Sequence, residues 1–155
     1  MLIKSEKELM ANIRLQYIMF NDIKCKHCGT FNLSPQAFKM LILMDHFFAR
    51  FRKSKISSWY RCPEHHLKTK ETEIGRKLTD DEKKSALNSG HTQGIAVDIT
   101  HPDPSEIFKN GIRFAEFSGM GLYPWGVHFD IKPRKSFWRS QGGKYQYFDS
   151  PLLVF

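Results

Sequence analysis

Long apolar runs are absent from this chain. None of its 155 residues lies in an apolar stretch that approaches the roughly 20 residues needed to span a bilayer, so no membrane span is expected. Arg14 and Gln16 interrupt the apolar candidate nearest the N-terminus, Ile13 to Phe20, and a secretory signal peptide is therefore not expected either. These absences predict a protein that is made in the cytoplasm.

Cysteine is scarce, with three residues in the whole chain. Cys25 and Cys28 stand in a Cys-Lys-His-Cys-Gly turn of the kind that binds zinc, and Cys62 is followed by His65 and His66. Three thiols leave one without a disulfide partner. The count favours buried thiols or a single disulfide, and a structural zinc ion held by the three cysteines and one histidine is the alternative.

Acidic residues are outnumbered, at 16 against 24 basic ones, and the formal net charge is +8. A positive surface favours a polyanionic neighbour, such as a bacterial wall with teichoic acids and anionic stem peptides, or a nucleic acid. It is equally a device for solubility. The charge alone does not decide between a wall, a nucleic acid and a role in solubility.

Repeats and low-complexity segments are also lacking. A hydrophobic content of 41% is ample for a folded core, and a chain of this length buries roughly 70% of its unfolded surface. We expect one domain over residues 1–155, a mixed α+β fold and a monomer.

Two short stretches carry most of the chemical information, Ser89–Asp98 and Gly126–Ile131. In the first, apolar side chains alternate with polar or small ones from Ile95 onward, which is the period of a strand with one buried face. In the second, His128 and Asp130 alternate with three apolar residues in the same way.

If the two predicted strands are neighbours, His91, Asp98 and His128 converge on one point. Two imidazoles and a carboxylate are the ligand set of a catalytic zinc site, which keeps a fourth position for water, whereas structural zinc sites are closed by four ligands. A lone histidine on a strand is more often a hydrogen-bonded structural residue. The repetition of the pattern favours the metal.

The same residues resemble a known family, the D-alanyl-D-alanine metallopeptidases, which cut peptidoglycan stem peptides and include carboxypeptidases, endopeptidases and phage endolysins. The family pattern Ser-x-His-x-x-Gly-x-Ala-x-Asp is matched throughout Ser89–Asp98, and its Val-His-x-Asp element is matched by Val127–Asp130. Trp59–His65, Gly121–Pro124 and Arg134–Trp138 are similar to further family segments. The resemblance runs from about residue 31 to residue 138.

The resemblance implies a fold and a site. The fold would be like that of hedgehog and the DD-peptidases, with a small antiparallel sheet that carries the zinc site and packs against helices. The zinc ligands would be His91, Asp98 and His128. Arg61 would hold a substrate carbonyl or carboxylate near the metal, since guanidinium is always charged and binds in a bidentate way. A surface ion pair is the plainer reading of Arg61.

The general base is where the chain departs from the family. Several branches have Glu or Asp three residues before the second histidine, and Trp125 stands there in this sequence. Asp130 is the strongest remaining candidate, either as the base or as a partner that orients a histidine ring. Glu116 and Glu64 are weaker, because nothing in their local pattern directs them to the metal.

The sequence therefore predicts a zinc-dependent peptidase that acts on peptidoglycan stem or cross-link peptides. Without a signal peptide, it would reach the wall after lysis or as part of a phage particle. The alternative is a catalytically inactive zinc domain of the same fold that binds the cell wall. A nucleic-acid-binding zinc protein built on Cys25 and Cys28 leaves the two alternating stretches unexplained, so we expect no nucleic acid partner.

Local signals predict the remaining elements. Residues 64–88 are rich in Lys and Glu and longer than the family suggests, so they form a solvated surface excursion or a flap beside the cleft. N-terminal capping signals open three helices, at Ser34, Thr79 and Asp103. The predicted ranges are a strand or short helix over 11–20, helices over 36–51, from Thr79 to about Leu87 and from Asp103 to Gly119, and strands over 56–61 and 144–148.

Overall fold

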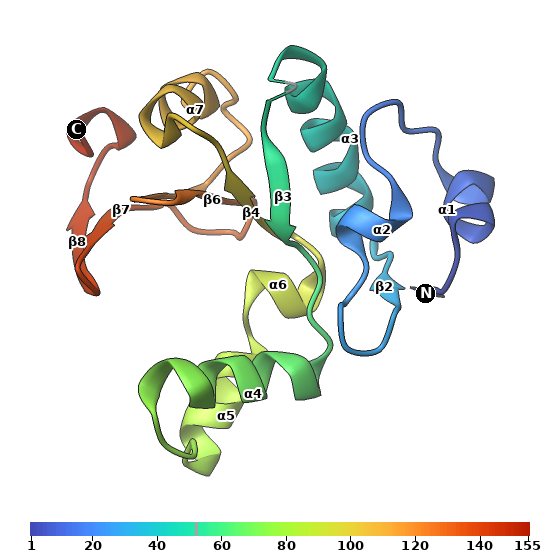
Figure 1. Ribbon diagram of the computed structural model, residues 1–155, viewed down its shortest axis with the longest axis horizontal. Helices are drawn as coiled ribbons and strands as arrows, with labels where there is room; N and C mark the ends of the chain where they lie inside the picture. The colour runs from blue at the N-terminus through green and yellow to red at the C-terminus, as the bar shows by residue number, and fades with distance from the viewer. Residues whose placement is uncertain (52) are drawn as a thin grey trace.

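The computed structural model describes residues 1–51 and 53–155 and is a mixed α+β structure (Figure 1). Its elements follow one another as β1 (Leu2–Ile3), α1 (Glu6–Asn12), α2 (Phe20–Ile23), β2 (Phe31–Asn32), α3 (Pro35–Arg50), β3 (Lys55–Ser58), α4 (Pro63–Ile74), α5 (Asp80–Leu87), α6 (Gly90–Gln93), β4 (Ala96–Thr100), α7 (Pro104–Gly111), β5 (Gly119–Tyr123), β6 (Gly126–Asp130), β7 (Ser136–Gln141), β8 (Lys144–Phe148) and a final 3-10 turn (Pro151–Leu153).

The larger sheet has six strands in the order β3-β4-β6-β5-β7-β8, and β1 and β2 form a separate antiparallel pair. Neighbours in the larger sheet are antiparallel except β5 and β7, which are parallel. Strand β6 already lies between β4 and β5, so the chain after it adds β7 at the free edge of β5. The sheet is therefore larger than the small antiparallel one that we expected, and it is mixed.

One face of this sheet is apolar and covered by α3 and α7. The alternating residues predicted to face the core, Ile95, Val97 and Ile99, are almost fully buried. Phe47 of α3 contacts Phe129 of β6, with ring centroids 5.5 Å apart. These contacts join the helices and the sheet in one hydrophobic cluster.

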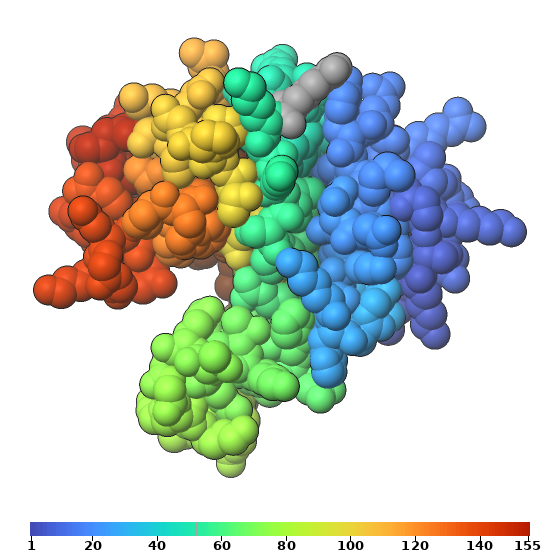
Figure 2. Space-filling view, viewed as in Figure 1, coloured from blue at the N-terminus to red at the C-terminus, as the bar shows by residue number. Residues whose placement is uncertain are grey.

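The opposite face is polar and carries a row of residues in register. Ser58, Asp98, His128, Gly121, Trp138 and Tyr147 are successive partners across the six strands. Beyond one end of this face, α4 and α5 form a helical hairpin that projects from the body of the molecule (Figures 1 and 2). Residues 64–88 are thus an ordered helical hairpin.

The predicted helix caps and the predicted edge strand are confirmed. Ser34 caps α3 by accepting from the Ala37 backbone N–H at 3.0 Å, and Thr79 caps α5 in a capping box with Glu82. Asp103 caps α7 by accepting from the Glu106 N–H. Strand β8 spans Lys144–Phe148 at the sheet edge, as predicted.

Three predicted ranges are wrong. Residues 11–20 are not one element, because the Asp45 carboxylate accepts the backbone N–H groups of Gln16 and Tyr17 and holds an irregular link between α1 and α2. Strand β3 ends at Ser58, three residues early, after an irregularity in its pairing with β4. Helix α7 ends at Gly111, and Gly119 instead begins β5.

Among the described helices, none is long and apolar enough to cross a membrane.

Candidate metal centre

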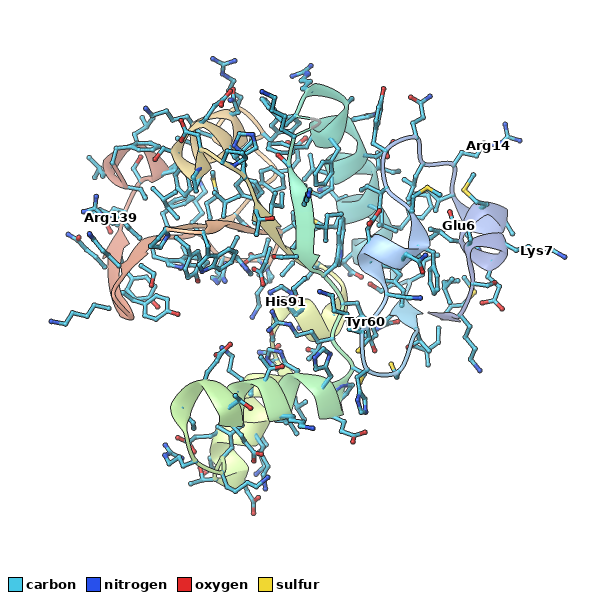
Figure 3. All side chains as sticks on the ribbon, viewed as in Figure 1. Glu6, Lys7, Arg14, Tyr60, His91 and Arg139 are labelled. Atoms are coloured by element: carbon cyan, nitrogen blue, oxygen red, sulfur yellow. The ribbon has the colours of Figure 1, made fainter. Side chains whose placement is uncertain are left out.

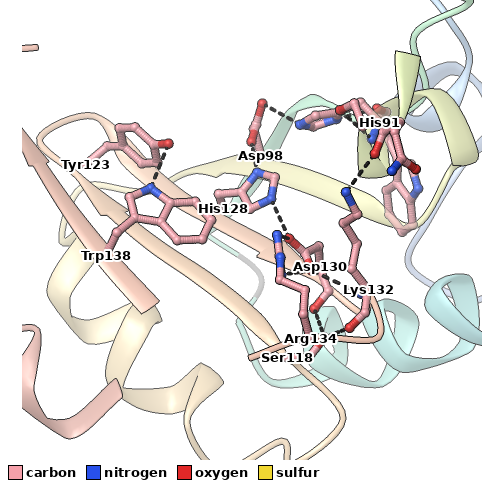
Figure 4. A network of polar contacts seen from close by, with 12 residues as sticks. His91, Asp98, Ser118, Tyr123, His128, Asp130, Lys132, Arg134 and Trp138 are labelled. Carbon is pink, nitrogen blue, oxygen red and sulfur yellow. Dashed lines mark hydrogen bonds and ion pairs between the residues drawn. The ribbon is translucent and has the colours of Figure 1, made fainter. Parts of the chain in front are cut away.

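The polar face brings together the three residues that the sequence singles out. His91, Asp98 and His128 each offer one ligand atom, and these atoms lie within 4.8 Å of one another. His91 Nε2 is 3.3 Å from Asp98 Oδ2, and His128 Nδ1 is 2.7 Å from Asp98 Oδ1 (Figure 4). Asp98 and His128 are direct partners on β4 and β6, which explains their convergence.

His91 lies on the short helix α6, just before β4. Ser89 caps this helix by accepting the His91 backbone N–H, and Gly94 ends it at φ 74°, a left-handed conformation that glycine adopts readily. His91 is 6% exposed and stands where the helical hairpin meets the sheet (Figure 3).

The His91 ring has a defined orientation. Its Nδ1 is 2.7 Å from the backbone carbonyl oxygen of Trp59, and a carbonyl only accepts hydrogen bonds. Nδ1 therefore donates its proton to Trp59, and Nε2 points at Asp98. Histidine ligands of metals are held by the same kind of bond from the nitrogen that does not bind the metal.

The His128 ring is held in the opposite sense. Its Nε2 lies 3.2 Å from Asp130 Oδ2, and its Nδ1 faces Asp98. Burial opposes a charge on this ring, but the hydrogen bonds to Asp130 and Asp98 outweigh it and raise the pKa of His128 to about 9. Because Nε2 is held by Asp130, Nδ1 is the nitrogen that faces Asp98, and an ion bound there would replace the proton on Nδ1.

Both carboxylate oxygens of Asp130 accept hydrogen bonds on the side of His128 away from Asp98. Its two oxygens accept from the Arg134 guanidinium at 2.9 Å each, and one also accepts from the Lys132 backbone N–H at 3.0 Å. Burial raises the pKa of Asp130, but the bonds from His128 and Arg134 outweigh it and lower the pKa to about 2. The residue is 1% exposed. This geometry favours its role in orienting His128 over a role in proton transfer.

Gly119 makes this arrangement possible. It is the β5 partner of Asp130, and a Cβ atom on it would stand 2.2 Å from Asp130 Oδ2. Any other residue at this position would displace the carboxylate that orients His128.

Arg61 lies in the site and not on the open surface. Its Nη2 donates to Asp98 Oδ2 at 3.0 Å and its Nε donates to Ser58 Oγ at 2.8 Å. The side chain is 14% exposed. Burial raises the pKa of Asp98, but His91 and His128 outweigh it and hold that pKa well below the usual range, so Asp98 is a carboxylate here.

A cleft of about 540 Å³ opens above these residues. Figure 2 shows the hollow between the helical hairpin and the β7–β8 end of the molecule. The hairpin contributes one wall, and the β7–β8 turn with the aromatic residues of β5 and β7 contributes the other. The residues that line these walls are His66, Lys70, Glu73, Tyr123, Trp125, Trp138, Gly142, Gly143 and Tyr145.

The aromatic wall stands directly beside the candidate ligands. The ring centroids of Trp138 and His128 are 5.3 Å apart. The Trp138 Nε1 donates to the Tyr123 hydroxyl at 2.9 Å. Trp125 stacks on Tyr123 with ring centroids 4.8 Å apart and is 47% exposed. Gly121 leaves the space that the Trp138 ring occupies, since a Cβ there would lie 2.3 Å from that ring.

The hairpin stands beside the cleft, as one of the two alternatives for residues 64–88 expected, but the residues with which it lines the cleft were missed in the sequence analysis. His66, Lys70 and Glu73 have the i, i+4, i+7 spacing of one helix face, and that spacing was the available signal. His66 is 2% exposed, and its ring is stacked 6.5 Å from that of His91. Its Nδ1 has no hydrogen-bond partner among the described residues. The weaker candidates Glu64 and Glu116 do not line this cleft.

A second group of metal-ligand type lies elsewhere. Cys25, Cys28 and Cys62 have their Sγ atoms within 4.8 Å of one another, and all three are free thiols. None of them lines the cleft. The structure therefore contains two groups of side chains able to hold a metal ion.

Comparison with known proteins does not indicate a function for this chain. The chain matches no protein-family model, no curated protein and no solved structure.

Proposed function

We propose that this protein is a zinc-dependent peptidase that hydrolyses stem or cross-link peptides of peptidoglycan. The observation that carries the proposal is the convergence of His91, Asp98 and His128 with both rings oriented by acceptors outside the ligand set. Two imidazoles and one carboxylate suit zinc in a catalytic site. An ion bound there supplies a Lewis acid and a water whose pKa is lowered to about 7.

In this proposal, Arg61 binds the substrate. It lines the cleft and carries a permanent positive charge beside Asp98. A peptide carbonyl or carboxylate that enters the cleft meets this guanidinium, which stabilises negative charge as it develops on oxygen. Lys70 on the hairpin also lines the cleft, where it is paired with Glu73 at 2.6 Å.

Hydrolysis adds water across the C–N bond, with the oxygen going to the acyl carbon and a proton to the leaving amine. Asp130 is engaged behind His128, so the proton requires another carrier. We assign this role to His66, which lines the cleft next to His91. Burial and the Arg61 charge lower the pKa of His66 to about 4, so its ring is neutral at pH 7, and its Nδ1 has no hydrogen-bond partner among the described residues.

The choice of substrate rests on the resemblance between residues 31–138 and the D-alanyl-D-alanine metallopeptidases. The zinc pattern of that family falls on the residues that converge, and its later elements fall on β5, β6 and β7, which build the cleft. The positive charge of the chain is compatible with an anionic wall.

The test is digestion of defined peptidoglycan fragments by the zinc-loaded protein, with mass analysis of the products. New amine and carboxyl ends are expected with wild type, and none with His91→Ala or His128→Ala. The matched control is His46→Ala, because His46 is an exposed histidine on α3 that does not line the cleft. Cleavage by the ligand variants at the wild-type rate would contradict the proposal.

A second pair of variants tests the proton carrier. His66→Gln should lower kcat by about 100-fold or more with its zinc content unchanged. Glu73 lines the same cleft but is paired with Lys70 at 2.6 Å, so Glu73→Gln should have a small effect. The reverse order of effects would move the role to Glu73.

One observation favours a different function on the same scaffold. Trp125 occupies the position where related enzymes have an acid, and it presents an exposed ring to the cleft. An inactive zinc domain that binds cell wall would use this ring as a binding surface. Zinc-dependent retention on purified sacculi, without any new amine ends, would favour binding over hydrolysis.

A further inference from the structure

The cysteine group gains a fourth candidate ligand in the folded chain. His65 Nδ1 lies 3.3 Å from Cys25 Sγ. Cys62 and His65 are three residues apart, as are Cys25 and Cys28, so each of two turns offers a pair of ligands. The short spacing within each pair is that of structural zinc sites.

The distances among the three sulfurs agree with a tetrahedral ion, and His65 is within reach of one of them, that of Cys25. Zinc–sulfur bonds of about 2.3 Å at tetrahedral angles place two thiolates roughly 3.8 Å apart, and a thiolate and an imidazole nitrogen roughly 3.6 Å apart. The three Sγ atoms lie within 4.8 Å of one another, and the Cys25–His65 pair lies at 3.3 Å. A single disulfide would use two of the sulfurs and leave the third thiol and His65 beside it without a function.

The backbone around the sulfurs has the form of a metal-binding knuckle. The Gly29 N–H donates to the Cys25 carbonyl at 2.8 Å, and Gly29 has φ 71°, so the chain turns back directly after Cys28. The backbone N–H of Cys62 donates to Cys25 Sγ at 3.3 Å. Such a bond stabilises negative charge on the sulfur.

We propose that Cys25, Cys28, Cys62 and His65 hold a structural zinc ion, distinct from the ion of the cleft. Four protein ligands close the coordination sphere, so this ion has no position for a substrate. This proposal does not depend on the proposed peptidase function, because the four ligands do not line the cleft.

The position of this ion suggests a structural role. It joins the α2–β2 loop to the first turn of α4, and Tyr60 already connects the same two regions by donating its N–H to the Ile23 carbonyl (Figure 3). Arg61 directly precedes Cys62, and Trp59 supplies the carbonyl that orients His91. The ion therefore anchors the segment that places both Arg61 and His91.

The experiment is metal analysis of the full chain together with cobalt substitution. Wild type should bind about two zinc ions per chain, and Cys28→Ser, which alters an exposed thiol, should bind about one. His65→Ala should also lose one ion, whereas the neighbouring His27→Ala should lose none. Cobalt in place of zinc should give wild type a thiolate-to-cobalt charge-transfer band.

His91→Ala separates the two sites. It should lose the cleft ion but keep the thiolate-to-cobalt band, so failure of the peptidase proposal leaves this result intact. The cobalt titration of wild type stands even if Cys28→Ser does not fold. Absence of the band, or a single reactive thiol in denatured and unreduced protein, would overturn the proposal in favour of free thiols or a disulfide.

Discussion

At the scale of single residues, the candidate centre depends on groups that never reach the cleft. Asp130 fixes the His128 ring, the Trp59 carbonyl fixes the His91 ring, and Gly119 leaves room for the Asp130 carboxylate. Such partners determine which ring nitrogen is free for an ion. The site is thus built by residues whose own chemistry is not used in the proposed hydrolysis.

Asp130→Asn tests this dependence. It keeps the shape of the side chain but removes the charge that binds Arg134 and holds the His128 Nε2 proton, so zinc affinity at the cleft should fall about 10- to 100-fold. Competition with a chelating dye, in a Cys28→Ser background, measures this site alone. Asp149→Asn, at an exposed carboxylate, is the control, and equal affinities for the two variants would contradict the role.

At the scale of elements, the α4–α5 hairpin is held differently from the rest of the chain. Helix α5 has no buried residue, and its start depends on the Thr79 capping box and on the Arg76–Glu82 ion pair. Local polar contacts therefore replace a core in this element. Since His66 and Glu73 line the cleft from α4, the hairpin's position affects the site.

The hairpin should weaken in acid. Hydrogen bonds from Arg76 and from the Thr79 backbone lower the pKa of Glu82 to about 2, from an ordinary 4.5. A carboxyl whose folded pKa is depressed stabilises the fold above its unfolded pKa, and this contribution is lost as the pH falls through 4.5 toward 2. The protection factors of the α5 amides against hydrogen exchange, corrected for the intrinsic effect of pH, should fall over this range while those of the sheet amides stay high.

Titration of the Glu82 side chain by NMR gives the direct measurement. Arg76→Gln removes the bidentate partner, so the Glu82 midpoint should move upward toward its ordinary value. A midpoint that does not change in this variant would show that Arg76 contributes nothing to it.

At the scale of the whole molecule, one hydrophobic cluster holds the fold, and the two proposed ions would add to its stability. The cluster joins the N-terminal segments, α3, α7 and the buried face of the larger sheet. The cleft stands on the opposite face, outside this core. Its candidate ligands are also linked directly, by the contacts of Asp98 with His91 and His128, and Asp98 forms an ion pair with Arg61.

Metal removal should therefore destabilise the protein without unfolding it. A ligand at 1,000 times its dissociation constant stabilises the native state by about 4 kcal/mol, so chelation should lower Tm by roughly 8 to 16 °C for each site that is emptied. Circular dichroism should still report a folded chain, because the core does not depend on the ions. The His91→Ala variant should respond less to chelator than wild type, and equal responses would contradict an ion in the cleft.

The sequence by itself determined the parts that depend on local periodicity and capping. The alternation around Asp98 and His128 placed both strands and both buried faces, and the capping residues Ser34 and Thr79 placed the starts of α3 and α5. These signals act within a few residues, so they survive in a single sequence.

Only the tertiary structure decided what depends on contacts between distant segments. The engagement of Asp130 by Arg134, the entry of His66 into the cleft, the parallel pairing of β5 with β7 and the meeting of His65 with Cys25 all follow from packing. The path of residues 13–19 follows from a carboxylate on α3, 28 residues from its partner Tyr17. No local pattern contains such contacts, because the partners become neighbours only when the core has formed.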